Sequence, residues 1–379
     1  MVKVDRESTT RDPAKIVLLR RKLLDWYAIN RRALPWRRTR DPYAIWVSEI
    51  MLQQTRSTVV IERFQSFLAR FPNVATLASA PQQDVLAEWS GLGYYRRARM
   101  LHKAAQLLMA NHDGDLPATA AELRALPGIG AYTAAAVASI AHGEVVAVVD
   151  GNVERVICRL EGWEHGRRDG AAALVHGIES YAQALVDPVH PGDFNQAVME
   201  LGATVCTPRN PQCLVCPLVA GCRTQGEHKT APRPRMLSRE VAYGLCLRDH
   251  GIRVGTRRRI VTEMVPQVLL AQRPEAETVM PGLWELPALK EAAVPDGDLR
   301  MTVRHAIMQV NYYVRIRTVR EDEVEALAVD SATRHWIPLA EAANLPLTGL
   351  ARKVLMRAHL VPAAAPRAQL APWDAGDLP

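Results

Sequence analysis

Four of the six cysteines lie close together, and this cluster constrains the fold of the chain more than any other feature of the sequence. They have the spacing C-x6-C-x2-C-x5-C, at Cys206, Cys213, Cys216 and Cys222. In an intracellular protein, four thiols in so short a segment favour a bound metal over disulfides. Zinc usually takes two Cys-x2-Cys pairs separated by a longer loop, whereas compact and uneven spacing favours an iron–sulfur cluster. We therefore predict an iron–sulfur cluster, with zinc as the alternative.

The composition indicates an intracellular, globular protein and favours a polyanionic partner. The chain has 379 residues, of which 48% are hydrophobic, and a net charge of +7. No apolar run approaches the roughly 18 residues of a membrane helix. Residues 1–11 contain no apolar stretch for a secretory signal, so we expect a cytoplasmic protein, associated with the nucleoid in a bacterium. Basic residues cluster between Arg20 and Arg40 and between Arg96 and Lys103, which indicates either polyanion binding or solvated faces.

The pattern of apolar residues divides the chain into two domains of different class. We predict an α+β protein with an all-α domain over 12–225, which includes the cysteine loop, and an α/β domain over 241–360. A linker is expected at 226–240, where Pro232 and Pro234 stand among basic residues. A disordered tail is expected at 361–379, which is rich in Ala and Pro. Helices are expected from Asp12-Pro13 and Asp41-Pro42 onward and over 55–70, 82–89, 94–111, 118–125, 131–142, 151–161, 170–186 and 193–204. Strands are expected over 241–248, 268–273 and 312–319, followed by a closing helix over 348–360.

The segment Leu126-Pro127-Gly128-Ile129-Gly130 joins two predicted helices. Gly128 and Gly130 allow a tight turn whose backbone N–H groups open outward at the start of the next helix, where they can bind a phosphate. Such a turn is too short to read bases, so it would bind the DNA backbone without sequence preference. The alternative is an ordinary turn between two helices.

Two carboxylates stand in contexts that suit acid–base chemistry. Glu49 has apolar neighbours at helical spacing and no basic residue three or four positions away, so we expect a buried carboxyl with a raised pKa. Asp150 precedes a predicted helix, where it could also be a simple N-cap.

Several of these segments together resemble a known family. LPGIGAYTAAAV, VVDGNVERV and the cysteine spacing resemble the helix-hairpin-helix DNA glycosylases that include endonuclease III. SEIMLQQTR, LPWR and GLGYYRRAR narrow the resemblance to the adenine DNA glycosylases, the MutY family. The resemblance is dense over residues 15–225 and fainter over 241–360, which resembles that family's Nudix-like domain. It implies a 4Fe–4S cluster on the four cysteines.

The resemblance also implies the chemistry of a monofunctional glycosylase. Glu49 would protonate the departing adenine and then help to activate water, and Asp150 would stabilise the cationic sugar. Asn152 and Tyr132 match positions that orient this site. Relatives that also cleave the strand carry a Lys at the position of Tyr132, where it forms a Schiff base. We therefore expect any lyase activity to be weak.

The implied substrate is double-stranded DNA with an adenine mispaired with 8-oxoguanine or guanine. The protein is expected to act as a monomer and to bind no membrane. Adenine must leave the base stack to be reached. Gln54, Leu92 and Tyr94 match the family's wedge and its contacts to the partner strand.

The second domain is expected to bind the opposite base rather than to hydrolyse a nucleotide. Residues 282–287, GLWELP, resemble the Nudix-like domain, but 290–298 lack the glutamate-rich helix of a Nudix hydrolase. The family reads 8-oxoguanine with a Phe-Ser-His turn, for which Val303-Arg304-His305 is the best match. His305 is kept, whereas Arg304 replaces the serine and predicts weaker discrimination between 8-oxoguanine and guanine. Residues 250–266 look like an insertion to which the sequence assigns no role.

Two other interpretations remain open at this point. One is an endonuclease III-like glycosylase with lyase activity, which Tyr132 and the second domain disfavour. The other is a non-catalytic DNA-binding protein with an iron–sulfur cluster. Glu49 and Asp150 disfavour it, because binding the DNA backbone needs neither carboxylate.

Overall fold

A computed structural model describes residues 13–163, 171–228, 235–256, 259–277, 279–290, 298–307, 309–327 and 333–362. These residues form two compact units. We call the first, with described residues from 13–79 and 100–228, the helical unit. The second, with described residues from 80–99 and 235–362, is the sheet unit. No helix in the described part of the chain is long and apolar enough to span a membrane.

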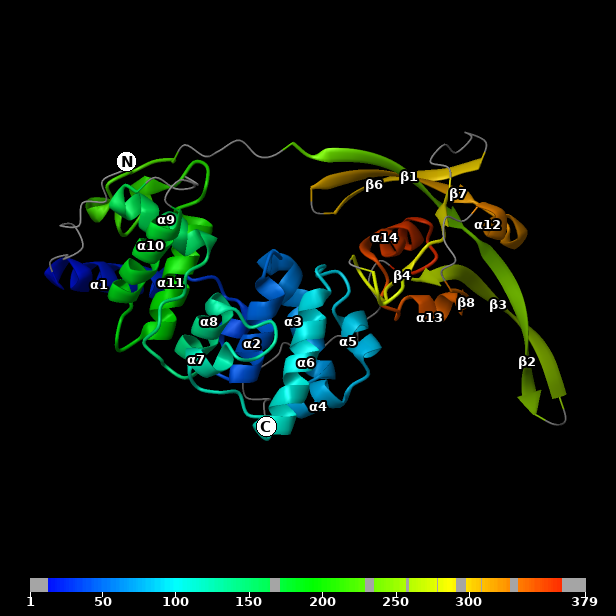
Figure 1. The fold of residues 1–379 in the computed structure, drawn as a ribbon, viewed down its shortest axis with the longest axis horizontal. Coiled ribbons are helices and arrows are strands. Elements are labelled where there is room, and N and C mark those ends of the chain that lie inside the picture. The colour runs from blue at the N-terminus through cyan, green and yellow to red at the C-terminus, as the bar shows by residue number, and fades with distance from the viewer. Residues whose placement is uncertain are drawn as a thin grey trace. The chain divides into compact units, whose positions relative to one another are not determined.

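The helical unit contains only helices and turns among its described residues (Figure 1). Its elements are α1 (Pro13–Asn30), η2 (Pro35–Arg37), α2 (Pro42–Leu52), α3 (Ser57–Arg70), α4 (Val74–Ser79), α6 (Arg96–Asn111, from Met100 on), α7 (Ala120–Leu123), α8 (Ala131–Ala141), α9 (Gly151–Glu161), α10 (Ala171–Leu185), α11 (Pro191–Thr204), η3 (Cys213–Val215) and η4 (Val219–Gly221). The predicted helices of this unit are confirmed to within a few residues, whereas the short helix α4 was not predicted.

Helix α2 begins where its sequence predicts. The carboxylate of Asp41 accepts hydrogen bonds from the backbone N–H groups of Tyr43 and Ala44, and Pro42 occupies the first turn, where no N–H is needed. Its residues from Tyr43 to Met51 are all buried. Helix α2 is therefore a central element of the unit, and any polar side chain that it carries is buried. Asp12, the other predicted cap, lies outside the described residues.

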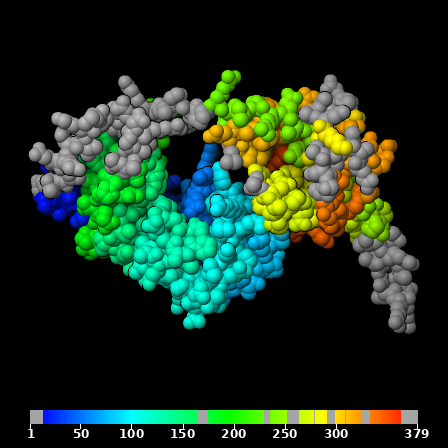
Figure 2. Space-filling view, in the orientation of Figure 1, coloured from blue at the N-terminus to red at the C-terminus, as the bar shows by residue number. Residues whose placement is uncertain are grey.

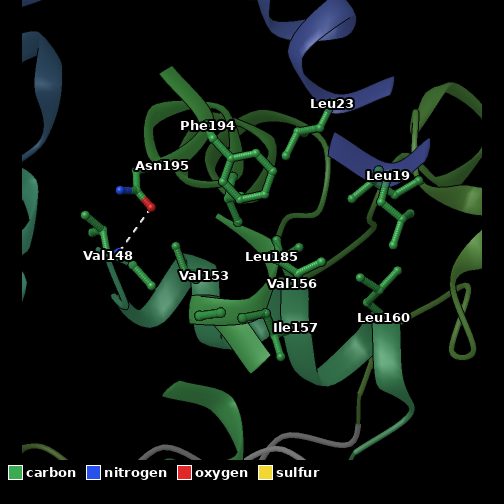
Figure 3. Close-up of a pocket in the computed structure, with 14 residues that line it drawn as sticks. Leu19, Leu23, Val148, Val153, Val156, Ile157, Leu160, Leu185, Phe194 and Asn195 are labelled. Carbon is green, nitrogen blue, oxygen red and sulfur yellow. Dashed lines mark hydrogen bonds between the residues drawn. The ribbon is translucent and has the colours of Figure 1, made fainter. Parts of the chain in front are cut away.

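Helix α9 is held by an apolar core that it shares with α1 and α11. Figure 3 shows Val153, Val156 and Ile157 of α9 facing Phe194 and residues of α1. In the same view, the side-chain oxygen of Asn195 accepts a hydrogen bond of 3.1 Å from the backbone N–H of Val148. The start of α9 is thus held in two ways: by apolar packing, and by the hydrogen bond that ties the preceding segment to Asn195 of α11.

Helices α9 and α11 also approach each other closely at Gly202. A Cβ at this position would lie 2.6 Å from the Cβ of Asn152, which is closer than side chains tolerate. Gly202 therefore allows α11 to pass directly beside the first turn of α9.

The sheet unit combines strands and short helices. Its elements are α5 (Gln82–Glu88), the start of α6, β1 (Leu237–Leu245), β2 (Leu247–Thr256), β3 (Arg259–Gln272), β4 (Trp284–Glu285), β5 (Ala288–Leu289), β6 (Leu299–Ile307), β7 (Val310–Thr318), α12 (Glu321–Leu327), β8 (Arg334–Pro338), α13 (Leu339–Ala342) and α14 (Gly349–Arg357). One sheet has the order β5-β1-β7-β6, with β1 and β7 parallel. The other has the order β2-β3-β4, and β8 pairs with β3. The core between them includes Leu270, Val314, Ile316 and Val354.

The predicted mixture of helix and strand is confirmed, but several boundaries differ. The strand predicted over 241–248 is two strands, because the chain leaves one sheet after Leu245 and enters the other at Leu247. Strand β1 begins at Leu237, inside the predicted linker, because residues from Leu237 onward pair with β7. The described parts of the unassigned stretch, 250–256 and 259–266, belong to the paired strands β2 and β3. Most of the predicted tail lies outside the described residues.

Candidate active site

A pocket of about 280 Å³ lies in the helical unit, between α2, α8, α9, α11 and the segment before η2. In Figure 2 this unit is hollowed between its blue part and its green part, the two parts of the chain that supply most of the lining. The charged and polar side chains that line the pocket are Arg32, Arg37, Ser48, Glu49, Thr55, Ser57, Tyr132, Asp150, Asn152, Gln196 and Glu200. All four side chains predicted to be catalytic therefore line one pocket, although they come from three helices and the residue before α9.

Glu49 projects from α2 and is only 4% exposed. The hydroxyl of Tyr132, on α8, donates a hydrogen bond of 2.6 Å to Oε2 of Glu49. Burial raises the pKa of Glu49 from its ordinary 4.5 to about 7; the Tyr132 hydrogen bond opposes this shift, and the charge of Asp150 adds to it. Glu49 is therefore a carboxyl that can hold its proton near neutral pH, as the apolar pattern around it predicted.

Asp150 is the N-cap of α9 and uses both carboxylate oxygens. Oδ1 accepts hydrogen bonds from the backbone N–H groups of Asn152 at 2.9 Å and Val153 at 2.7 Å. Oδ2 accepts one from the side-chain amide of Asn152 at 2.9 Å. Asp150 is thus both a helix cap and a wall of the pocket, so the two interpretations of this residue are compatible.

Arg155 holds Asn152 in place, a contact that the sequence did not suggest. Its Nη2 donates to Oδ1 of Asn152 at 2.8 Å and to the backbone oxygen of Gly202 at 2.6 Å. Its Nε donates to the backbone oxygen of Cys206 at 2.8 Å. The amide of Asn152 therefore has a fixed orientation, since its nitrogen faces Asp150 and its oxygen faces Arg155.

A buried ion cluster forms another wall of the pocket and was also not predicted. Glu200 is fully buried and lies 2.7 Å from Nη2 of Arg32 and 2.8 Å from Nη2 of Arg37. Burial alone would raise the pKa of Glu200, but hydrogen bonds from Arg32 and Arg37 outweigh it and lower the pKa to about 2. At neutral pH, Glu200 is therefore ionised, whereas Glu49 can be neutral. The one signal in the sequence was the run of arginines around LPWR.

The predicted phosphate-binding turn has the backbone that it needs. Gly128 has φ of +79°, and a Cβ there would lie 2.5 Å from Cβ of Met100. Ile129 is buried, whereas both glycines are exposed. Gly130 is the N-cap of α8 and supplies no side-chain hydrogen bond to the first turn. The first N–H groups of α8 can therefore receive an anion from outside.

The residues predicted to contact the partner strand lie in different units. Gln54, which follows the C-cap of α2, is exposed and has φ of +56°. Leu92 and Tyr94 belong to the sheet unit, where Leu92 is 4% exposed and Tyr94 is 54% exposed. Tyr94 is thus the side chain that reaches outward, while Leu92 packs inside the protein.

The expectation that Val303-Arg304-His305 forms a turn is wrong. These residues lie inside strand β6, which extends to Ile307 and pairs with β7. Arg304 is exposed, and its guanidinium lies 5.8 Å from the centroid of the Tyr313 ring on the neighbouring strand. Alternating apolar residues and the pairing with β7 make this segment a strand, so Arg304 does not replace a serine in a tight turn.

The four cysteines of the cluster line one cavity of about 30 Å³ beside the end of α11. Arg159 lines it too, and its Nη1 lies 3.4 Å from Sγ of Cys206. The described residues contain no group of three or more His, Cys, Asp or Glu side chains placed to hold a single metal ion. The thiols instead surround a shared space.

Comparisons with known proteins match this chain to DNA repair proteins. Residues 47–174 match the model of the HhH-GPD superfamily of base excision DNA repair proteins. An adenine DNA glycosylase of Mus musculus is 39% identical over 322 residues, which cover 73% of this chain and 62% of the mouse protein. The adenine DNA glycosylase of Homo sapiens is 46% identical over 224 residues, which cover 57% of this chain and 41% of the human protein. The chain therefore spans less than two thirds of the length of these relatives.

A solved structure gives the same result for the fold. A thermostable thymine-DNA glycosylase is 30% identical, with a TM-score of 0.51, and the match covers 56% of this chain and 97% of that protein. With its buried glutamate, its capping aspartate and its glycine turn assembled in one helical unit, this chain belongs to the HhH-GPD superfamily of base excision DNA repair proteins and, within it, resembles the adenine DNA glycosylases.

Proposed function

We propose that this protein is a monofunctional adenine DNA glycosylase of base excision repair. It would hydrolyse the N-glycosidic bond of adenine mispaired with 8-oxoguanine or guanine. One observation carries the proposal: Glu49, with a pKa of about 7, and the N-cap carboxylate Asp150 line the same pocket. One neutral acid and one carboxylate are what the cleavage of a glycosidic bond requires.

The division of labour follows from the two environments. Glu49 donates its proton to a ring nitrogen of adenine while the bond from C1′ to adenine breaks and its electron pair leaves with the base. Asp150 stabilises the positive charge that develops on the sugar. Glu49, now a carboxylate, accepts a proton from the water that bonds to C1′, which restores the acid. A positioned proton donor of this kind commonly contributes about 10²–10⁴-fold in rate.

The pocket supports hydrolysis without strand cleavage. A lyase needs an amine that attacks C1′ and forms a Schiff base. Among the described residues that line the pocket there is no lysine. Tyr132 occupies the position expected for that lysine, and its hydroxyl is bonded to Glu49 instead.

We propose double-stranded DNA as the partner of a monomeric protein. The turn at Gly128 and Gly130 would bind a phosphate, and Tyr94 would fill the space that the extruded adenine leaves. The match to the mouse relative covers 73% of this chain, which is a larger share than the helical unit makes up, so the match extends into the sheet unit. This extent supports a role for the sheet unit in the same activity. That role would be to read the base opposite the adenine.

We also propose that the cysteine cavity holds a 4Fe–4S cluster on Cys206, Cys213, Cys216 and Cys222. The donor set fits this cluster. A 4Fe–4S cluster is held by four cysteine thiolates that surround it, whereas a zinc ion needs its ligands on one metal atom. Nη1 of Arg159, 3.4 Å from Sγ of Cys206, would donate a hydrogen bond to that ligand. When bound, the cluster would cross-link the loop that follows α11. Purified protein should be brown and contain about four iron and four sulfide per chain; zinc in their place would contradict the proposal.

The activity test is a duplex with a single adenine opposite 8-oxoguanine. After incubation, alkali breaks the strand wherever a base has been released, and the fragment length locates the site. We expect cleavage at the adenine only after alkali. Strand breaks without alkali, together with a covalent adduct trapped by borohydride, would support a lyase. DNA binding without base release would support a non-catalytic DNA-binding protein.

A further inference from the structure

Residues 80–99 precede most of the helical unit in the sequence, yet they pack within the sheet unit. This segment carries the exposed Tyr94, which we expect to act as a wedge, and the buried Leu92. We refer to residues 90–94 as the wedge loop. The structure thus joins the wedge loop to the unit that is expected to read the opposite base.

Two side chains that follow the wedge loop make this attachment. The hydroxyl of Tyr95 donates a buried hydrogen bond of 2.9 Å to the backbone oxygen of Leu347. Nη2 of Arg99 donates one of 2.6 Å to the backbone oxygen of Pro281, and its Nη1 lies 3.3 Å from Oε2 of Glu275. Gly282, with φ of +64°, keeps this approach open, since a Cβ there would lie 3.0 Å from Nη2 of Arg99.

The two anchor points belong to one hydrogen-bonded patch around Trp284. The backbone N–H of Trp284 donates to Pro346, its oxygen accepts from Thr348, and the residue forms a parallel bridge with Leu347. Pro281 precedes Trp284 by three residues in the chain. Tyr95 and Arg99 are therefore tied to neighbouring parts of the same core segment.

The side chain of Arg97 links the wedge loop to the start of α6, so a shift at Tyr95 or Arg99 would be passed on to Tyr94. Gly91, Gly93 and Tyr94 all have positive φ, at +96°, +69° and +46°. Nη2 of Arg97 donates to the backbone oxygens of Leu92 and Gly93, at 3.0 Å each. The guanidinium of Arg97 also lies 5.7 Å from the centroid of the Tyr94 ring.

We propose that Tyr95 and Arg99 are positioning residues through which the sheet unit sets the place of Tyr94 in the DNA. The inference rests on the proposed function, because it assumes that Tyr94 fills the gap left by an extruded adenine. Recognition of the opposite base and extrusion of the adenine are then coupled through the backbone at Pro281 and Leu347.

The test compares Tyr95→Phe and Arg99→Gln in the full chain with Tyr43→Phe. Tyr43 makes the same kind of buried bond, 2.8 Å to the backbone oxygen of Phe71, but it lies in the helical unit. The probe is 2-aminopurine opposite 8-oxoguanine, whose fluorescence rises when it leaves the stack. We expect the extrusion signal at saturating protein to fall about three- to tenfold in the two test variants, the range that corresponds to one lost hydrogen bond. Tyr43→Phe should lose similar stability and keep the signal.

The outcomes separate this inference from the proposed function. If the test variants keep the wild-type extrusion signal while their stability falls as in Tyr43→Phe, the coupling is overturned and the function stands. If the wild-type protein extrudes the probe in a way that depends on Tyr95 but releases no adenine, the function fails and the coupling stands. A wild-type protein that neither extrudes nor releases the base overturns both.

Discussion

The hydroxyl of Tyr132 lies 2.6 Å from Oε2 of Glu49, although the two residues are 83 positions apart in the chain. The contact joins α8 to α2 at the wall of the pocket. A donor at this distance stabilises the charged form of a carboxylate, so Tyr132 lowers the pKa that burial raises. The balance between burial and this hydrogen bond leaves Glu49 able to donate a proton near neutral pH.

Adenine release should therefore decline as the pH rises through about 7, because Glu49 then loses the proton that it must donate. Tyr132→Phe removes a contact that lowers the pKa of Glu49, so the decline should move to higher pH. Single-turnover rates across the neutral range measure the midpoint, with Tyr43→Phe as a control whose midpoint stays in place. A midpoint that moves to lower pH in Tyr132→Phe would show that another group controls the rate.

Glu49→Gln and Asp150→Asn should each reduce base release at least about 10²-fold, the lower end of what a positioned catalytic group supplies. Asparagine is also a good N-cap, so Asp150→Asn should preserve α9 and leave DNA binding nearly unchanged. Single-turnover rates and binding to an uncleavable duplex check both statements. A loss of less than about tenfold at either position would remove that residue from the mechanism.

Arg155→Lys should lower base release about tenfold without weakening DNA binding, because small errors in orientation are costly in catalysis. Lysine cannot reproduce the bonds that Arg155 makes to Asn152, Gly202 and Cys206, so Asn152 would lose its fixed orientation. Arg20→Lys is the matched control, since Arg20 also bonds backbone oxygens of the helical unit, at Leu185 and Ala184. Equal rates in the two variants would mean that Arg155 has no part in positioning the site.

The sheet unit should become less stable as the pH rises, because of Glu285. This side chain is buried, it accepts hydrogen bonds from Thr348 and the N–H of Leu286, and burial raises its pKa from 4.5 to about 7. The folded state therefore holds the proton more tightly than the unfolded state does. Its contribution to stability is complete below about pH 4.5 and is lost as the pH rises through about 7.

Glu285→Gln should remove this loss. Between pH 5 and pH 8, the free energy of unfolding should fall by about 1–3 kcal/mol less in the variant than in the wild type. Urea unfolding at the two pH values measures the difference. Part of the pH dependence should remain, since Glu49 titrates in the same range. If the variant and the wild type lose stability in parallel, Glu285 does not titrate as we infer.

Local features were predictable from the sequence because they depend on neighbours in the chain. The cap at Asp41, the glycine turn at Gly128 and the N-terminal position of Asp150 each follow from a few adjacent residues. The apolar neighbours of Glu49 also indicated that it would be buried. The segment around Arg304 shows the limit: a weak motif match suggested a turn, whereas pairing with β7 decided that it is a strand.

Tertiary structure alone decided which distant groups meet. The bond between Tyr132 and Glu49, the burial of Glu200 between two arginines, and the packing of residues 80–99 in the sheet unit join segments far apart in the sequence. Spacing along a chain specifies caps, turns and the face of a helix, but it does not specify which helix will supply the partner of a buried charge. The sequence by itself thus determined the chemical groups and their local supports, and long-range packing decided their environments, because desolvation and hydrogen bonds between elements exist only once the chain is folded.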